Sequence, residues 1–507
     1  MNKSIKNIFA MLLVTSAFAA CSDKLDINTN PVQPVTTSSN LRLPGVLGNM
    51  AYHLYSHARF SVYHSYYFTN RLGSTRAIED TWNYNSITRM GAWRWHYYDV
   101  GSNVNGLIER AIEEGSTNYL GVAKIMLAFS YLTATDSFGD MPFTEAYSGS
   151  YYPKYDTQET IYAGIANLLD EGVAALDQES NKSLVMNSAS DLVYAGDLQK
   201  WKAFAFAVKS RMLLHTANFT NNYDAVISNV NIALSNFDDA MIKYPESSSD
   251  LWEKNLWGET AAQPEWQFAD IKNISANSLP TDFLMNALTI DAVAGKYDPR
   301  LYALTTPGEN KKYLGAKESE GLSDLNLPTG TTYKDFATLT GGFWTADKSP
   351  YPFILKEELY FIKAEAEFYK GNATAAFEAW KQGVKINFSR LGIADGESLN
   401  YLSSSKVPQD AGELKISDIM MQKWLALYLQ SETWVDMRRY NYSATAYPGV
   451  YYPKNALKEW GGRNIQRFPY DPQTEYVYNP QEIARLGATA RDWCFNPVWW
   501  AEKSTLK

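Results

Sequence analysis

The chain has 507 residues, with 46 basic and 55 acidic side chains and a formal net charge of −9. A chain with this acidic balance is not expected to bind nucleic acid or an anionic bilayer surface. Its aromatic content is high, with 35 Tyr, 22 Phe and 15 Trp. Tyr and Trp join a flat apolar face to a polar edge, which suits ligands such as sugars, although we expect most of these rings to pack in the core.

The first 20 residues are expected to form a secretory signal peptide. Lys3 and Lys6 give it a positive start, and residues 8–20 are almost wholly apolar or small. This stretch is shorter than the roughly 20 apolar residues that a membrane-spanning helix needs. Removal of residues 1–20 leaves 44 basic and 55 acidic residues, a net charge of −11.

Cys21 follows the apolar segment directly and is the predicted site of lipidation. A cysteine at such a cleavage point receives the acyl chains of a bacterial lipoprotein, and Ala19 and Ala20 are small enough to admit the peptidase. Phe18 stands where such signals usually carry Leu. The alternative is therefore an ordinary cut after Ala19, which leaves a soluble secreted protein. Acylation of Cys21 would leave Cys494 without a disulfide partner in the chain.

Beyond the cysteine, the sequence predicts a tether and one domain. Residues 21–40 lack apolar periodicity and carry turn-forming and polar residues, so we expect a lipid-anchored tether. Residues 41–507 are expected to form a single, mostly α-helical domain with little β structure. Two segments, about residues 240–350 and 441–478, lack long helical patterns and are predicted to be loop-rich. A helical scaffold with long aromatic-bearing loops is typical of a binding face made by loops.

Several segments have the apolar spacing of helices. In residues 156–176, Ile161 and Ile165 fall on the same face, and Asp156 with Glu159 fits a capping box before the helix. The segment 196–214 repeats the apolar pattern. These spacings predict long helices that pack by one face.

Residues 357–384 match one degenerate copy of a tetratricopeptide repeat. Alignment of Gly371 with the turn places aromatic or small residues at five expected positions, namely Tyr360, Ala364, Ala376, Trp380 and Gly383. Two other expected positions carry Lys363 and Glu367. Together with the neighbouring helix pairs, this match predicts a tetratricopeptide-like helix-pair scaffold.

The usual catalytic motifs are missing from the sequence. It has no G-x-S-x-G, no P-loop, no G-x-G-x-x-G and no H-E-x-x-H. His53 and His57 are four residues apart, with His64 beyond, but no carboxylate adjoins them, so we expect packed or surface histidines and no bound metal. Glu357 and Glu358 fit a helix start better than a glycosidase carboxylate pair. We expect a protein without enzymatic activity and without a cofactor.

The residues expected to contact a ligand lie in loops. The six candidates are Trp82, Asn83, Tyr84, Asn70, Arg71 and Trp344. The first three combine an aromatic ring, an amide and a phenol in one polar segment, which offers stacking and hydrogen bonds together. The last follows two glycines. Four further aromatic residues lead into a helix and are expected to be core in part, namely Trp93, Trp95, Tyr97 and Tyr98.

An ordered set of motifs extends over nearly the whole mature chain. It comprises Cys21 with LDINTNP, then DSFGDMPFTEA, GDLQKWKAFAFAVKSRM, KYDPRL, QKWLALYLQSETWVDMRR, RFPYDPQTEYVYN and PVWW. This set resembles the SusD/RagB family, the lipid-anchored outer-membrane nutrient-binding proteins of Bacteroidetes, and its closing motifs look most like the SusD-like subgroup. Asp298-Pro299-Arg300 and Arg438-Arg439 within these motifs are expected to fix turns and helix ends.

The resemblance implies a mostly α fold with tetratricopeptide-like helix pairs. It also implies a protein held at the cell outer membrane by its N-terminal lipid, surface-exposed, and placed as a lid on a TonB-dependent, SusC-like transporter. The implied ligand is an oligosaccharide or polysaccharide, bound without catalysis and delivered to the transporter. The alternative ligand class is a peptide, captured by the lid of a peptide-importing transporter. A surface hydrolase is the third hypothesis.

Overall fold

The computed structural model describes residues 37–70, 81–245, 253–260, 278–320, 327 and 329–506. The predicted signal peptide, Cys21, most of the predicted tether and Arg71 lie outside these ranges. Most of the described elements are α-helices, which confirms the mostly α prediction. Within the described ranges, no helix combines the length and apolar character needed to cross a bilayer.

Long helices lie on both sides of a middle segment that has short elements. The helices before it are α2 (Ser39–His64), α4 (Gly91–Arg94), α5 (Asn103–Glu114), α6 (Thr117–Phe138), α7 (Gln158–Leu176), α8 (Leu198–Thr220) and α9 (Tyr223–Leu234). The middle segment holds α10 (Asp282–Ala287) and α11 (Arg300–Leu304). The later helices are α12 (Lys356–Tyr369), α13 (Ala373–Arg390), α14 (Asp395–Leu402), α15 (Ile416–Ala426), α16 (Glu432–Arg439), α17 (Glu475–Tyr478), α18 (Pro480–Arg485) and α19 (Trp499–Lys503).

Helical turns of other types complete the helical part of the chain. A π-helix, η2 (Trp95–Ser102), joins α4 to α5 without a break. The 3-10 turns are η1 (Tyr84–Ser86), η4 (Tyr333–Asp335), η5 (Lys458–Trp460) and η6 (Trp493–Phe495). In the predicted loop-rich segments, the described residues hold only short helices, turns and strands.

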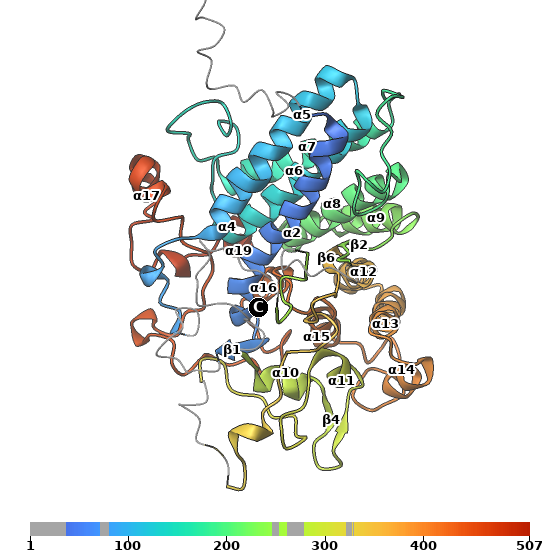
Figure 1. Ribbon diagram of the computed structural model, residues 1–507. Helices are drawn as coiled ribbons and strands as arrows, with labels where there is room; N and C mark the ends of the chain where they lie inside the picture. The colour runs from blue at the N-terminus through green and yellow to red at the C-terminus, as the bar shows by residue number, and fades with distance from the viewer. Residues whose placement is uncertain are drawn as a thin grey trace, which may run out of the picture.

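Three helix pairs, α6–α7, α8–α9 and α12–α13, make the most extensive contacts of the scaffold (Figure 1). The backbones of α6 and α7 approach closely, since a Cβ added to Gly121 would lie 2.8 Å from the Gly172 carbonyl oxygen. Between α12 and α13, Gly371 has a φ of +79°, a conformation that glycine adopts without steric cost. This is the turn that the sequence predicted, and the helix-pair fold is confirmed.

The start of α7 differs from the predicted capping box. Thr157 occupies the cap position, where its Oγ1 accepts a hydrogen bond from the Thr160 backbone N–H at 3.3 Å. The Asp156 carboxylate instead accepts hydrogen bonds from the backbone N–H groups of Phe143 and Thr144, at 3.0 and 2.8 Å. Asp156 therefore holds the loop that follows α6 rather than the helix end.

Strands are short in the described residues. They form three two-stranded antiparallel sheets, β1 (Phe68–Asn70) with β3 (Ser278–Pro280), β2 (Ala240–Ile242) with β6 (Tyr351–Ile354), and β4 (Thr289–Asp291) with β5 (Lys296–Tyr297). Phe68 lies opposite Pro280, and Ala240 lies opposite Ile354. Because β1 follows α2 and β6 precedes α12, the first two sheets connect the middle segment to the helical scaffold (Figure 1).

Aromatic side chains fill much of the hydrophobic core. Among the largest buried side chains, each less than 2% exposed, are Trp82, Trp201, Trp380, Trp424, Trp434 and Trp500. The Trp424 ring stacks on Tyr67 with a centroid separation of 4.5 Å and nearly parallel planes. This packing agrees with the expectation that most of the aromatic residues serve the core.

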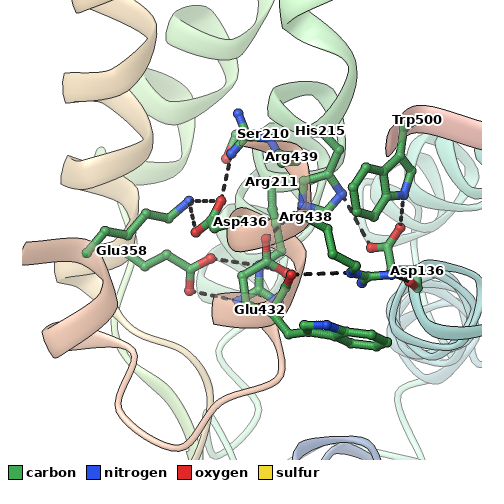
Figure 2. A network of polar contacts seen from close by, with 12 residues as sticks. Asp136, Ser210, Arg211, His215, Glu358, Glu432, Asp436, Arg438, Arg439 and Trp500 are labelled. Carbon is green, nitrogen blue, oxygen red and sulfur yellow. Dashed lines mark hydrogen bonds and ion pairs between the residues drawn. The ribbon is translucent and has the colours of Figure 1, made fainter. Parts of the chain in front are cut away.

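A network of buried ionisable side chains joins α6, α8, α12 and α16 (Figure 2). Arg211 donates two hydrogen bonds of 2.7 Å to Glu358. His215 lies 2.7 Å from Glu432 and 3.3 Å from Asp136. Burial alone lowers the pKa of His215, but the two carboxylates raise it to about 9. His215 is therefore protonated at neutral pH, and its charge is compensated inside the protein.

The same network continues at α15 and the C-terminal end of α16. Arg439 lies 2.5 Å from Glu365 and 2.6 Å from Asp436. Lys423 lies 2.8 Å from Asp436 and 3.9 Å from Glu365. The four side chains are at most 3% exposed. Each charge is thus paired within the core, which is the condition for burying it.

The two motifs that were expected to fix turns and helix ends are also buried. Arg300 begins α11, and its Nη2 lies 2.7 Å from Asp298 Oδ2. In Arg438, Nη1 donates hydrogen bonds to the carbonyl oxygens of Asp136 and Gln466, at 2.7 and 2.8 Å. The first contact fixes a turn, and the second ties the end of α16 to α6 and to the C-terminal segment.

Candidate functional site

Three of the six predicted contact residues are buried. Trp82 is 1% exposed, and Tyr84 and Trp344 are each 3% exposed. The Trp82 ring packs edge-on against Tyr452, with 5.2 Å between centroids. The loop context predicted aromatic faces open to a ligand, but core side chains cover these rings. Polar neighbours in the sequence marked a loop correctly without indicating that the rings turn inward.

The other three predicted residues differ in position. Asn83 is partly exposed, and its Nδ2 donates a hydrogen bond of 2.7 Å to Ser86 Oγ. Asn70 is half-buried at the end of β1, opposite Ser278 of β3. Arg71 lies outside the described residues. Ligand contact by Asn70 and Asn83 stays a prediction.

The histidines considered as metal ligands are packed in the core. His53, His57 and His64 are 0% exposed, and the rings of the first two lie 4.7 Å apart. Burial lowers the pKa of His53 and of His64 to about 3, so both are neutral at physiological pH. Among the residues that the structure describes, no group of three or more His, Cys, Asp or Glu side chains is placed to hold a metal ion.

A pocket of about 380 Å³ is lined in part by residues of α4 and α17. Both helices lie on the same side of the molecule (Figure 1). Its lining comes from three segments, 89–98, 142–153 and 471–479, and we call it the tyrosine pocket. The aromatic residues of its lining are Trp93, Tyr97, Tyr98, Tyr147, Tyr151 and Tyr478. A concave site that combines aromatic side chains with several polar groups is the usual form of a small-ligand site.

The first wall of the tyrosine pocket is set by the π-helix η2. A π-helix is wider than an α-helix, and such turns inside longer helices occur often at functional sites. Trp93, from the preceding helix α4, is 5% exposed, whereas Tyr98 of η2 is 63% exposed. The Tyr97 hydroxyl donates a hydrogen bond of 2.6 Å to the Pro142 carbonyl oxygen. This bond joins the first wall to the second.

The second wall is the loop 142–153, which is held at several points. The Phe143 ring packs on Tyr131 and fills the space beside Gly164, where an added Cβ would lie 2.2 Å from the ring. Tyr147 adopts a left-handed φ of 61°, and its hydroxyl donates a hydrogen bond of 2.9 Å to the Tyr97 carbonyl oxygen. Tyr151, in contrast, is 89% exposed. The loop is therefore anchored at its base and open at its tip.

The third wall comes from α17, near the C-terminus. Glu475 accepts a hydrogen bond of 2.9 Å from Trp93 Nε1 and another from the Tyr155 hydroxyl. Burial raises the pKa of Glu475. Asn479 Nδ2 donates a hydrogen bond of 2.7 Å to the Pro153 carbonyl oxygen, and Tyr478 is 63% exposed. These bonds hold α17, with its exposed Tyr478 ring, beside the other two walls.

The sequence contained part of the signal for this pocket. Tyr147 and Tyr151 lie in EAYSGSYYPK, a part of the loop after α6 in which aromatic residues are interspersed with Gly and Ser. Tyr98 belongs to the four aromatic residues that the sequence predicts to be core in part. Nothing local connects these residues with Tyr478, which is more than 300 positions away.

Replacement of Gly101 by alanine is expected to disturb the tyrosine pocket by displacing Tyr147, although Gly101 itself is not in the lining. A Cβ at this position would lie 1.7 Å from the Tyr147 hydroxyl oxygen and 2.8 Å from the His96 carbonyl oxygen. We expect the Tyr147 side chain to move and the Kd for a ligand of the pocket to rise about tenfold. The free energy of unfolding should fall by about 1–3 kcal/mol. Affinity electrophoresis and urea unfolding measure the two effects separately.

A double-substitution cycle tests the steric cause of that effect. In a Tyr147→Ala background, Gly101→Ala should weaken ligand retention little further, because the displaced ring is already gone. The loss of stability should persist, since it includes the contact with the His96 backbone. Equal and additive losses of retention in the two backgrounds would contradict the steric explanation.

Comparison with known proteins gives a consistent picture. A family model described as SusD-like, starch-binding and associating with the outer membrane, matches residues 31–470. A SusD/RagB family protein from Bacteroides thetaiotaomicron is 22% identical with a TM-score of 0.69, covering 92% of this chain and 99% of its own. A chitin-binding SusD homolog from Flavobacterium johnsoniae is 17% identical with a TM-score of 0.69, covering 91% and 98%. No curated protein matched the sequence.

Proposed function

The chain belongs to the SusD-like family, and on this premise we propose that it is a surface-exposed lipoprotein that binds oligosaccharides or polysaccharides without altering them. Cys21 carries the lipid anchor in this proposal. The bound glycan passes to a TonB-dependent, SusC-like transporter in the outer membrane. The family description names starch and the outer membrane, and a protein of similar fold is described as chitin-binding, which supports a carbohydrate ligand.

The observation that carries the proposal is the set of exposed tyrosine rings around the tyrosine pocket. Tyr98, Tyr151 and Tyr478 are between 63% and 89% exposed. Sugar rings have C–H faces that stack on such rings and hydroxyl groups that bind at the polar edges. Ser150 and Asn479 add polar groups to the same lining. Several weak stacking contacts favour long chains that engage them together.

Removal of these rings is expected to weaken glycan capture. The test uses the chain from residue 22 in native gels cast with a panel of plant, host and microbial polysaccharides. We expect retardation by at least one polymer, with Tyr151→Ala and Tyr478→Ala each costing about 1 kcal/mol, roughly fivefold in Kd. Both side chains are largely exposed, so the variants should remain folded.

Tyr302→Ala is the matched control. Tyr302 is 60% exposed but belongs to α11, well apart from α17 (Figure 1). Its removal should leave retardation unchanged. Retardation that persists in both pocket variants would place the glycan elsewhere. Failure of every polymer to retard the wild-type chain would remove the glycan proposal and make peptides the next ligands to test.

A further inference from the structure

The charges that line the tyrosine pocket are not balanced. Its two cationic side chains already have acidic neighbours. Arg94 Nε lies 3.1 Å from Asp99 Oδ2. Burial raises the pKa of Asp471, and Arg89 lies close enough to lower it in part. Arg94 thus lies beside Asp99, and Arg89 lies near Asp471.

Two other carboxylates in the lining, Glu145 and Glu475, have no such partner. In the ranges that the structure describes, neither forms an ion pair. Glu475 accepts hydrogen bonds from the Trp93 indole and the Tyr155 hydroxyl, both uncharged. Glu145 accepts one from the Lys154 backbone N–H at 3.0 Å. Each carboxylate oxygen can accept more than one hydrogen bond, so both groups can still receive a donor from a ligand.

The aromatic rings beside these carboxylates favour the same kind of ligand. The faces of Trp and Tyr rings carry negative electrostatic potential and attract ammonium and guanidinium groups. The pocket shows one example, because the Arg94 guanidinium carbon lies 4.6 Å from the Tyr98 ring centroid. Aromatic faces with uncompensated carboxylates form the arrangement that recognises an organic ammonium ion.

We infer that the tyrosine pocket binds a protonated amino group, so that the preferred glycan carries free amino sugars. This inference rests on the proposed glycan-binding function and deepens it. An ammonium group would form charge-assisted hydrogen bonds with Glu145 or Glu475 while the sugar ring stacks on tyrosine. Acidic sugars would meet the same two carboxylates and be disfavoured.

Three oligosaccharides of equal length separate the possibilities. They are a hexamer of glucosamine, its fully N-acetylated counterpart and a hexamer of glucose, titrated calorimetrically at a pH where the amine is protonated. We expect the glucosamine hexamer to bind about tenfold more tightly than the other two, with an advantage that shrinks as salt is added. Glu475→Gln should remove most of this preference, because it should weaken binding of the glucosamine hexamer more than binding of the N-acetylated hexamer.

Two further variants make the result specific. Glu475→Gln could also disturb Trp93 and Tyr155, whose side chains donate hydrogen bonds to Glu475. Glu145→Gln is therefore an independent test of the same preference. Glu459→Gln is the matched control, because Glu459 pairs with Arg491 at the surface outside the pocket and should not change the preference.

The outcomes separate this inference from the function on which it rests. Equal or tighter binding of a neutral hexamer overturns the amino-sugar inference and leaves glycan capture intact. Failure of all three hexamers to bind overturns both. A lysine hexapeptide that binds as tightly as the glucosamine hexamer would keep the ammonium site but overturn the choice of an amino sugar.

Discussion

Replacement of Glu365 by alanine is expected to lower the free energy of unfolding by about 3–5 kcal/mol. Glu365 is fully buried, and it accepts hydrogen bonds from Arg439 at 2.5 Å and from the Tyr440 hydroxyl at 2.8 Å. Without it, the buried cations Arg439 and Lys423 share the single carboxylate Asp436. An uncompensated charge in the core costs far more than the net contribution of the intact pair.

A surface glutamate provides the matched control for this loss. Glu179 and Lys182 form an ion pair of 3.1 Å, and their side chains are 83% and 86% exposed. Glu179→Ala should change the free energy of unfolding by no more than about 0.5 kcal/mol, because exposed pairs are weak. Urea unfolding followed by tryptophan fluorescence and circular dichroism compares the two variants. Similar midpoints would show that the network does not stabilise the fold as argued.

Mild acid is expected to destabilise the protein through its buried histidines. Burial lowers the pKa of four histidines, to about 3 for His53 and His64 and well below 6.5 for His57 and His96. In the unfolded chain these side chains titrate near 6.5. Below that pH the unfolded state binds more protons than the folded state, so stability falls as pH falls. The loss begins near pH 6.5 and continues toward about 3.

The expected slope is steep, because the four histidines act together. Each contributes about 1.4 kcal/mol per pH unit once its unfolded form is protonated, or about 5 kcal/mol per unit for all four. His215 does not oppose this trend, since its raised pKa of about 9 makes its stabilisation complete below 6.5. Glu432, with a pKa lowered to about 2, loses its contribution only at more acidic pH.

Urea unfolding at several values between about pH 7 and about pH 5 measures this slope. His96→Gln is the informative variant, because it removes one of the four groups. Whatever it does to stability at neutral pH, it should reduce the slope by about 1.4 kcal/mol per pH unit. A free energy of unfolding that stays constant down to about pH 5 would show that these histidines are not held neutral.

The helical scaffold was predictable because its signals are local. The i, i+4 spacing of Ile161 and Ile165 marked α7, and Gly371 marked the turn between α12 and α13. Both signals lie within one or two helical turns of sequence. The sequence predicted the cap of α7 at Asp156, one residue before the observed cap Thr157. Either side chain can accept the hydrogen bond that caps a helix.

The orientation of aromatic residues was not predictable in the same way. Trp82 lies among polar residues, yet its ring packs against His64 and against Tyr452, 370 positions further along the chain. Tyr151 has a comparable sequence context and is 89% exposed. What separates the two is whether a distant segment covers the ring, and a single sequence holds no local signal for that. The tyrosine pocket was missed for the same reason.

The three walls of the tyrosine pocket come from distant parts of the chain, and this has a consequence for biogenesis. A polypeptide that is complete only to residue 470 would have the helix pairs α6–α7 and α12–α13 but not Glu475 or Tyr478. The contacts that close the pocket join positions up to 382 residues apart. The entropic cost of closing a loop grows with its length, so these contacts are the most costly to form when the pocket assembles. Ligand capture would therefore be acquired at the end of folding, and a truncated or incompletely folded chain would hold the scaffold without the ability to bind.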